Sequence, residues 1–311
     1  MDALTDILNL VRMQSSLYFR TELSAPWGVR VPAKGKVARF HIVIRGHCWL
    51  NIDNQPTPVC MSNGDLVIIP HGAAHILADS AETPAKDLEE VLNEVDYVGT
   101  GPLVYGGGGA GCCLVCGEFE FDDKDSHPLL ENLPAKLCIT GDQSYNNQWL
   151  DSVMGFITHE AATLQPGANA IIDRLSEIIF IQVIRATLES SQQHIPFLSA
   201  FADPRISAVL TEIHANPAAD WSVENLGKLA NMSRSAFSNR FSELANMTPL
   251  QYVIFVRLQK AARLLTDSGD SLAAIAESVG YQSEAASSLA FKKQFGIRPG
   301  EYRRGQKREV A

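Results

Sequence analysis

The sequence contains no long apolar run, no basic leader and few cysteines. Because a membrane-spanning helix needs about 18 or more predominantly apolar residues in a row, none is expected here. Residues 1–6 carry no positive charge, so a secretory signal peptide is not expected either. Six cysteines without an export signal favour reduced thiols in the cytosol over a disulfide framework. These absences predict a cytoplasmic protein that has no membrane partner.

Charge is distributed unevenly along the chain. The net charge of −9 divides into −12 for residues 1–200 and +3 for residues 201–311. Phosphate binding requires local positive charge, and only the last third supplies it. Basic side chains gather near the end of that third, at Arg298, Arg303, Arg304, Lys307 and Arg308. This cluster is open to two interpretations, a solvated basic tail or a surface that contacts phosphates.

The last third also contains two successive patterns that are typical of helix-turn-helix units. Each pattern is a short amphipathic helix, a three-residue turn and a second helix. The segments are residues 221–230, 231–233 and 234–241 in the first unit, and residues 272–279, 280–282 and 283–293 in the second. Ser233 and Ser283 open the second helices as N-caps. Because the pattern occurs twice at the same internal spacing, it favours a tandem DNA-binding domain over a plain helical bundle.

The two units are separated by a predicted helix that starts at Thr248 and Pro249. This helix covers about 17 residues, or roughly 25 Å at 1.5 Å per residue. That length is enough to place two recognition helices about one turn of DNA apart.

Residues on the exposed face of each second helix are predicted to contact double-stranded DNA. In the first unit these are Arg234, Ser235, Ser238, Asn239 and Arg240. In the second unit they are Glu284, Ala285, Ser288, Lys292 and Lys293, the two lysines lying late in the helix.

Residues 203–306 resemble the DNA-binding domain of the AraC family of bacterial transcription regulators. The resemblance is most specific at residues 275–285, 291–296 and 299–303. Two positions depart from the family pattern: Ser287 stands where the family usually has phenylalanine, and Leu289 where it commonly has arginine or another polar residue. A leucine cannot make the bidentate guanine contact that an arginine makes, so base reading by the second unit is in doubt. The resemblance also implies RNA polymerase as a partner and a homodimer as the functional form.

The first 140 residues are predicted to form β-strands at residues 37–44, 48–52, 65–69, 112–121 and 137–140. Gly64, Pro70, Gly72 and His75 fit the second cupin motif, whereas Gly35 and His41 fit only the start of the first. The second metal-binding histidine of that first motif would fall at Val43, and the usual glutamate is missing as well. The region therefore resembles a cupin-like sensor domain of AraC regulators, within a subgroup that includes regulators responding to reactive chlorine species.

His41, His75 and Cys116 are the candidate sensor residues. The resemblance implies that both histidines point into the barrel, and Cys116 shares a strand face with Cys112 and Leu114. Two imidazoles and a thiolate suit zinc, copper or a thiol-based switch. The other interpretation is that the histidines are hydrogen-bonded pocket residues and that Cys116 is a small buried apolar group. All three interpretations remain open at this point.

The sequence thus predicts an α+β protein with three parts. Residues 1–140 form a cupin-like β-barrel sensor domain. Residues 141–200 form a helical dimerisation and coupling segment with a linker, and residues 201–311 form an all-α tandem helix-turn-helix domain. The predicted function is a sequence-specific transcription regulator controlled by a small effector, metal or oxidant. The alternative is a metal-dependent cupin enzyme with a helical appendage, which would need a complete three-histidine, one-carboxylate site.

Overall fold

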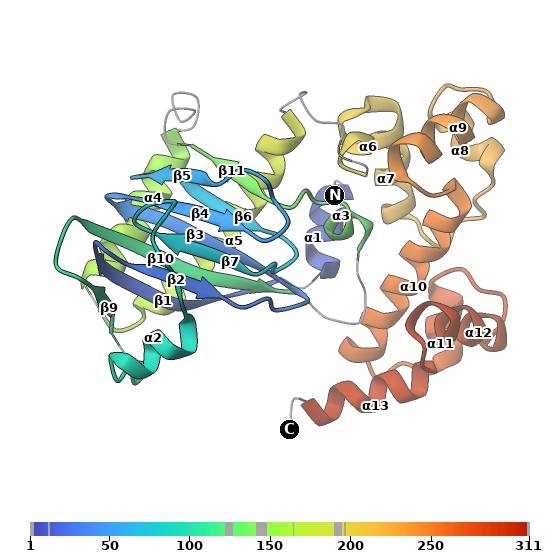
Figure 1. The fold of residues 1–311 in the computed structure, drawn as a ribbon. Helices are drawn as coiled ribbons and strands as arrows, with labels where there is room; N and C mark the ends of the chain where they lie inside the picture. Colours follow the sequence, from blue (N-terminus) through green and yellow to red (C-terminus); the bar gives the residue numbers. More distant parts are fainter. Residues whose placement is uncertain are drawn as a thin grey trace. The chain divides into compact units, whose positions relative to one another are not determined.

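The computed structural model describes residues 3–11, 13–99, 101–121, 127–140, 148–163, 165–189, 195 and 197–309. The chain forms two compact units. One comprises Met13–Phe121 and Leu133–Thr187, and the other comprises Met1–Arg12, Asp122–Asn132 and Leu188–Ala311. We call them the cupin unit and the helical unit. The predicted α+β class is confirmed (Figure 1). In the described part of the chain, every helix is too short or too polar to cross a membrane.

The cupin unit is built from two sheets. The first has the order β11-β6-β3-β10-β1-β9, and the second has the order β5-β4-β7-β2-β8. The strands of the first sheet are β1 (Gln14–Ser24), β3 (Val37–Arg45), β6 (Leu66–Ile69), β9 (Leu103–Gly106), β10 (Gly111–Glu120) and β11 (Leu137–Ile139). Those of the second are β2 (Gly28–Val31), β4 (His47–Ile52), β5 (Val59–Ser62), β7 (His75–Ala78) and β8 (Lys86–Asp87).

Apolar side chains from both sheets meet in one core. Val43, Leu50, Leu77 and Leu114 are each at most 4% exposed and come from β3, β4, β7 and β10. Successive side chains of a strand point to opposite faces, so the alternation that predicts these strands also decides which residues enter the core. The strands predicted at residues 37–44, 48–52, 65–69, 112–121 and 137–140 are confirmed as β3, β4, β6, β10 and β11.

Three helices accompany the two sheets: α2 (Leu88–Glu94), α4 (Gln148–Thr163) and α5 (Ala168–Glu189). The helices α4 and α5 lie along the outer face of the first sheet (Figure 1). The ring of Phe180 in α5 lies 5.0 Å from that of Phe119 in β10. In α4, the carbonyl of Ala161 accepts a hydrogen bond from Arg20 of β1 at 2.7 Å. Helices α4 and α5, which lie within the segment predicted to be helical, thus supply the cover of this sheet.

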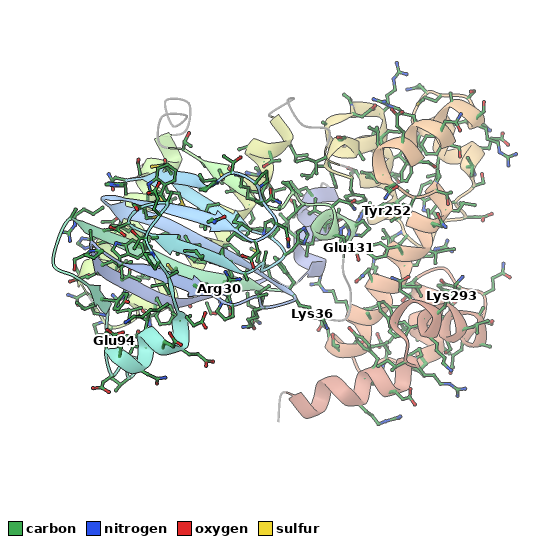
Figure 2. All side chains as sticks on the ribbon, viewed as in Figure 1. Arg30, Lys36, Glu94, Glu131, Tyr252 and Lys293 are labelled. Atoms are coloured by element: carbon green, nitrogen blue, oxygen red, sulfur yellow. The ribbon has the colours of Figure 1, made fainter. Side chains whose placement is uncertain are left out.

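The helical unit contains the two predicted helix-turn-helix motifs. Its helices are α1 (Ala3–Val11), α3 (Pro128–Glu131), α6 (Leu198–Ala202), α7 (Pro204–Ala215), α8 (Val223–Leu229), α9 (Arg234–Ala245), α10 (Pro249–Asp267), α11 (Leu272–Ser278), α12 (Glu284–Phe295) and α13 (Pro299–Glu309). Tyr252, labelled in Figure 2, is central to the first motif: its ring lies 5.8 Å from that of Phe241, and its hydroxyl is 2.7 Å from Nε2 of His214.

Two segments from the first half of the sequence belong to the helical unit. Helix α1 packs against α7 and α10, and its Ile7 is fully buried. His127 caps α3, and its ring lies 5.2 Å from Phe197 and 5.1 Å from Phe255. The compact units therefore do not coincide with the boundaries at residues 140 and 200 that the sequence suggests. The physical reason is that apolar surface on α7 and α10 is buried by segments that are distant in sequence.

Candidate DNA-binding faces and sensor site

Local side-chain caps define where the helices of both motifs begin. Ser233 accepts a hydrogen bond from the Ala236 amide, and Ser283 accepts one from the Ala286 amide. Such caps satisfy amides that have no partner within the helix, and replacing one by alanine typically costs about 1 kcal/mol. Both α9 and α12 therefore start at the residue that the sequence predicts.

The predicted base-reading residues of the first motif lie on the outside of α9. Arg234, Ser235 and Asn239 are exposed, and Ser238 is half-buried. The opposite face holds Phe237 and Phe241, which are fully buried. The exposed side chains lie in the N-terminal half of α9, the end of a recognition helix that reaches base edges.

The Arg240 side chain forms ion pairs with carboxylates of the helical unit. Its Nε donates to Asp203 at 3.0 Å, and its Nη1 donates to Glu243 at 3.3 Å. A DNA contact by Arg240 would therefore compete with two carboxylates. Arg303 of the C-terminal basic cluster is also engaged, because it donates to the carbonyls of Leu265 and Asp270.

In the second motif, Glu284, Ala285, Lys292 and Lys293 are exposed and Ser288 is half-buried. Figure 2 shows the side chain of Lys293 on α12. The two departures from the family pattern have opposite environments. Ser287 is 6% exposed and lies in the core, whereas Leu289 is 73% exposed on the surface of α12. The face of α12 thus presents an apolar side chain among its charged ones.

One arginine ties the two motifs together. Arg257 of α10 donates to the carbonyls of Pro217 and Ala219, at 2.7 and 2.9 Å, in the loop before α8. Its guanidinium also lies 6.0 Å from the ring centroid of Tyr281, in the turn before α12. At Gly280 φ is +88°, and a Cβ there would lie 2.7 Å from the Cα of Ala218. The turn of one motif therefore packs directly on the loop of the other, a contact that sequence reasoning missed.

In the cupin unit, His41 and His75 are in direct contact. Their Nε2 atoms are 2.8 Å apart, and both side chains are fully buried. Nδ1 of His75 lies 2.8 Å from the carbonyl oxygen of Ala73, which fixes the ring. Burial lowers the pKa of His75 to about 4 and that of His41 well below its usual range. Both imidazoles are thus neutral at pH 7, with one Nε2 donating to the other.

Cys116 lies beside this pair. It is the register partner of His41 across β3 and β10, and it is 4% exposed. Burial raises the pKa of the Cys116 thiol, so the thiolate that metals and oxidants require is disfavoured.

The histidine pair does not fit a metal centre. Two nitrogens that bind one zinc ion at about 2.0–2.1 Å with tetrahedral geometry would lie roughly 3.3 Å apart, not in hydrogen-bond contact. Within the described residues, no group of three or more His, Cys, Asp or Glu side chains is placed to hold a metal ion. This geometry favours the interpretation of hydrogen-bonded core histidines.

The space beside the histidine pair is small. The cavity beside His41 and Cys116 measures about 30 Å³ and is lined by apolar side chains such as Trp27, Leu77 and Leu103. That volume is about the share that one water molecule has in the liquid.

The fold and its exposed helix faces define a DNA-binding protein that carries a cupin domain. Comparison with known proteins agrees: a family model described as Cupin matches residues 2–189, and one described as Helix-turn-helix domain matches residues 226–305. An AraC-like transcription regulator of Streptomyces lividans is 32% identical and covers 98% of both chains. The transcriptional regulator AlkR of Acinetobacter baylyi is 31% identical, over 97% of this chain and 99% of that one. RclR of Escherichia coli, described as an RCS-specific transcriptional activator, is 28% identical over 97% of both chains.

The chain belongs to the AraC family of transcription regulators. The match to these transcription regulators extends over nearly the whole of each chain. The chain is therefore a transcription regulator, and the alternative of a cupin enzyme is set aside.

Proposed function

We propose that this regulator binds specific operator sequences through α9 and α12, and that a signal received by the cupin unit controls this binding. The observation that carries the proposal is the pair of serine-capped helices with exposed N-terminal halves in two tethered motifs, together with the polar side chains on the exposed face of α9. In α9, Arg234, Ser235 and Asn239 are the base readers of the proposal, because they are exposed and free of a core role.

Phosphate contacts complete the proposed interface. Lys292 and Lys293 are exposed near the end of α12, where they can reach the DNA backbone. With Leu289 exposed and Glu284 acidic, α12 has fewer groups that suit base edges than α9 has. The second motif therefore contributes mainly affinity and the first mainly specificity. The partners of this function are operator DNA and RNA polymerase, in the cytoplasm.

We propose further that two copies of the chain pair through α4 and α5. Phe156 is 60% exposed, and Ile171 and Ile178 are each 44% exposed. Large apolar side chains at this exposure on neighbouring helices favour burial against a second copy.

The signal is proposed to be a small effector. The buried His41 and His75 are too close for a shared metal ion, and the Cys116 thiol is held neutral. The name of RclR refers to reactive chlorine species, so an oxidant is the second candidate signal. The cysteines of this chain are all free thiols, and Cys60 and Cys138 are the exposed ones.

Selection of bound duplexes from a random DNA library tests the proposed function. The full chain should enrich one motif, with strong base preferences at the α9 subsite and weaker ones at the α12 subsite, about one helical turn away. A chain that binds DNA without enriching any motif would contradict the proposal. Repeating the selection with an excess of non-specific competitor DNA separates base reading from phosphate attraction.

A further inference from the structure

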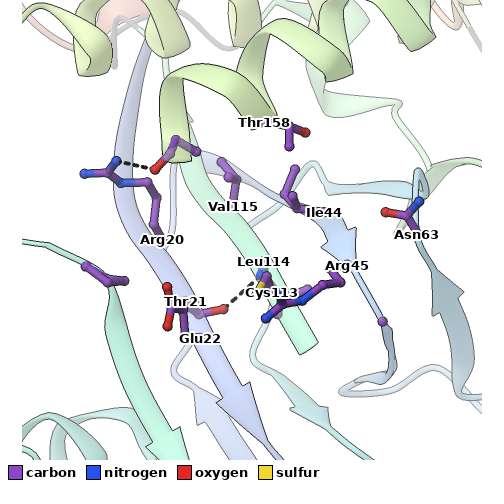
Figure 3. Close-up of a pocket in the computed structure, with 13 residues that line it drawn as sticks. Arg20, Thr21, Glu22, Ile44, Arg45, Asn63, Cys113, Leu114, Val115 and Thr158 are labelled. Carbon is purple, nitrogen blue, oxygen red and sulfur yellow. Dashed lines mark hydrogen bonds between the residues drawn. The ribbon is translucent and has the colours of Figure 1, made fainter. Parts of the chain in front are cut away.

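A pocket of about 700 Å³ lies outside the barrel, between the outer face of the first sheet and α4. Its floor is formed by β1, β3 and β10, and Thr158 and Ala161 of α4 form one side (Figure 3). Ile44, Val115 and Pro102 give it apolar walls. All of these residues belong to the cupin unit.

Volume distinguishes this pocket from the barrel interior. Sites for small molecules typically measure about 300–1,000 Å³, and the outer pocket lies within this range. The cavity beside His41 measures about 30 Å³, which is too small for any organic molecule. An effector of ordinary size would have to unpack the barrel core to bind there, whereas the outer pocket is already open.

Charged side chains stand in a defined row on the pocket floor. Glu22 of β1, Cys113 of β10 and Arg45 of β3 are register partners across three neighbouring strands. Adjacent strands are about 4.8 Å apart, so the backbone positions of Glu22 and Arg45 are roughly 10 Å apart. Arg20 adds a second guanidinium two residues before Glu22. The pocket lining therefore carries one carboxylate and two guanidinium groups.

The guanidinium of Arg45 is available to an anion. Its register partner on β10 is Cys113. Burial raises the pKa of the Cys113 thiol, so this thiol is neutral at pH 7 and does not compete as an anion. Among the described residues, neither Arg45 nor Arg20 forms an ion pair. An anion that enters the pocket thus meets positive charge that no protein carboxylate has neutralised by direct contact.

We propose that this outer pocket is the effector site of the regulator, and that its ligand is a small organic carboxylate whose apolar body lies against Ile44 and Val115 while Arg45 binds its carboxylate. A guanidinium matches a carboxylate with two parallel hydrogen bonds, which gives orientation as well as affinity. Glu22 opposes an anion and limits which ligands bind tightly.

The position of the pocket explains how its occupation is transmitted. Arg20 holds α4 through the Ala161 carbonyl, and both residues line the pocket (Figure 3). A ligand that contacts Arg20 and Ala161 changes the restraint between β1 and α4, and α4 carries the exposed Phe156 of the proposed dimer face. This inference rests on the proposed function, because it identifies where the signal enters.

The test uses the full chain and calorimetric titration with benzoate, 1-naphthoate and octanoate, each compared with its uncharged alcohol. At least one carboxylate should bind tenfold or more tightly than its alcohol. Arg45→Gln should weaken that carboxylate by roughly 10- to 100-fold, the range for losing a hydrogen bond to a charged group. Glu22→Gln should tighten it, because a repulsive charge is removed. Arg30→Gln is the matched control, since Arg30 is paired with Asp53 on the second sheet.

Ala161→Phe fills the pocket from α4 without changing any charge and should abolish carboxylate binding. Thermal unfolding of each variant confirms that it folds. The proposal is overturned if no carboxylate binds better than its alcohol, or if Arg45→Gln and Arg30→Gln behave alike. Operator binding without ligand is measured in parallel. A chain that retains operator binding but binds no carboxylate disproves this site alone, whereas loss of sequence-specific binding in the unmodified chain disproves the proposed function.

Discussion

Acidification should destabilise the cupin unit through its buried histidine pair. The pKa of His75 is about 4 in the folded chain and about 6.5 in an unfolded one, so the unfolded state binds the proton more tightly. The contribution of the neutral His75 ring to the free energy of unfolding is therefore fully present above about pH 6.5, and it decreases as the pH falls toward 4. At pH 5 the loss from His75 alone amounts to about 2 kcal/mol, since one pKa unit corresponds to about 1.4 kcal/mol. The pKa of His41 is lowered as well and adds to the loss.

Urea unfolding at pH 7 and pH 5 measures this effect. A Trp221→Phe background leaves Trp27, Trp49 and Trp149, all within the cupin unit, as fluorescent probes. His75→Gln keeps a hydrogen-bonding side chain but cannot titrate, so its loss between the two pH values should be about 2 kcal/mol smaller than that of the parent.

His47→Gln, at an exposed position on β4, is the matched control and should keep the parent's pH dependence. If His75→Gln loses as much stability as the parent between pH 7 and pH 5, protonation of this histidine pair does not cause the loss, and the reasoning is refuted.

Three further predictions concern metal, DNA and the dimer. Treatment with EDTA should leave the melting temperature unchanged, because His41 and His75 bond to each other; a clear fall would show a bound metal. Asn239→Ala should reduce the base preference at one operator position by about 1–3 kcal/mol, and an unchanged preference matrix would place the base readers elsewhere on α9. Lys292→Ala should weaken binding to all DNA sequences alike and lower the slope of the salt dependence by about one unit. Ile178→Asp should convert dimers to monomers in analytical ultracentrifugation, with the exposed Val98→Asp as the control, and a dimer that persists would move the interface away from α5.

Local chemistry is the part of this protein that its sequence predicts well. Ser233 and Ser283 cap the helices within three residues, so α9 and α12 could be placed without knowledge of the fold. The alternation around Cys112 and Leu114 likewise placed β10 and its inward face. These features depend on neighbours in sequence, and a single chain contains that information.

Features that depend on distant segments could not be predicted in this way. The pairing of Arg45 with Cys113 follows from a register shift between β3 and β10 that no residue pattern announces. The outer pocket forms because α4 lies over this part of the sheet, and the small size of the cavity beside His41 depends on side chains from both sheets. The alternation of the strand does indicate that Cys113 and Val115 lie on the face opposite Cys116. The sequence does not show which element covers that face.

The contact between Gly280 and the loop held by Arg257 has a consequence for the architecture of target promoters. Since Arg257 fixes the two motifs to each other, the angular phase between the two subsites is set by the protein. One inserted base pair rotates the second subsite by roughly 34° about the duplex axis, given about 10.5 base pairs per turn. The tethered motifs cannot follow that rotation without separating Gly280 from Ala218. The distance between the α9 subsite and any base that α12 prefers should therefore be constant among the promoters of this regulator.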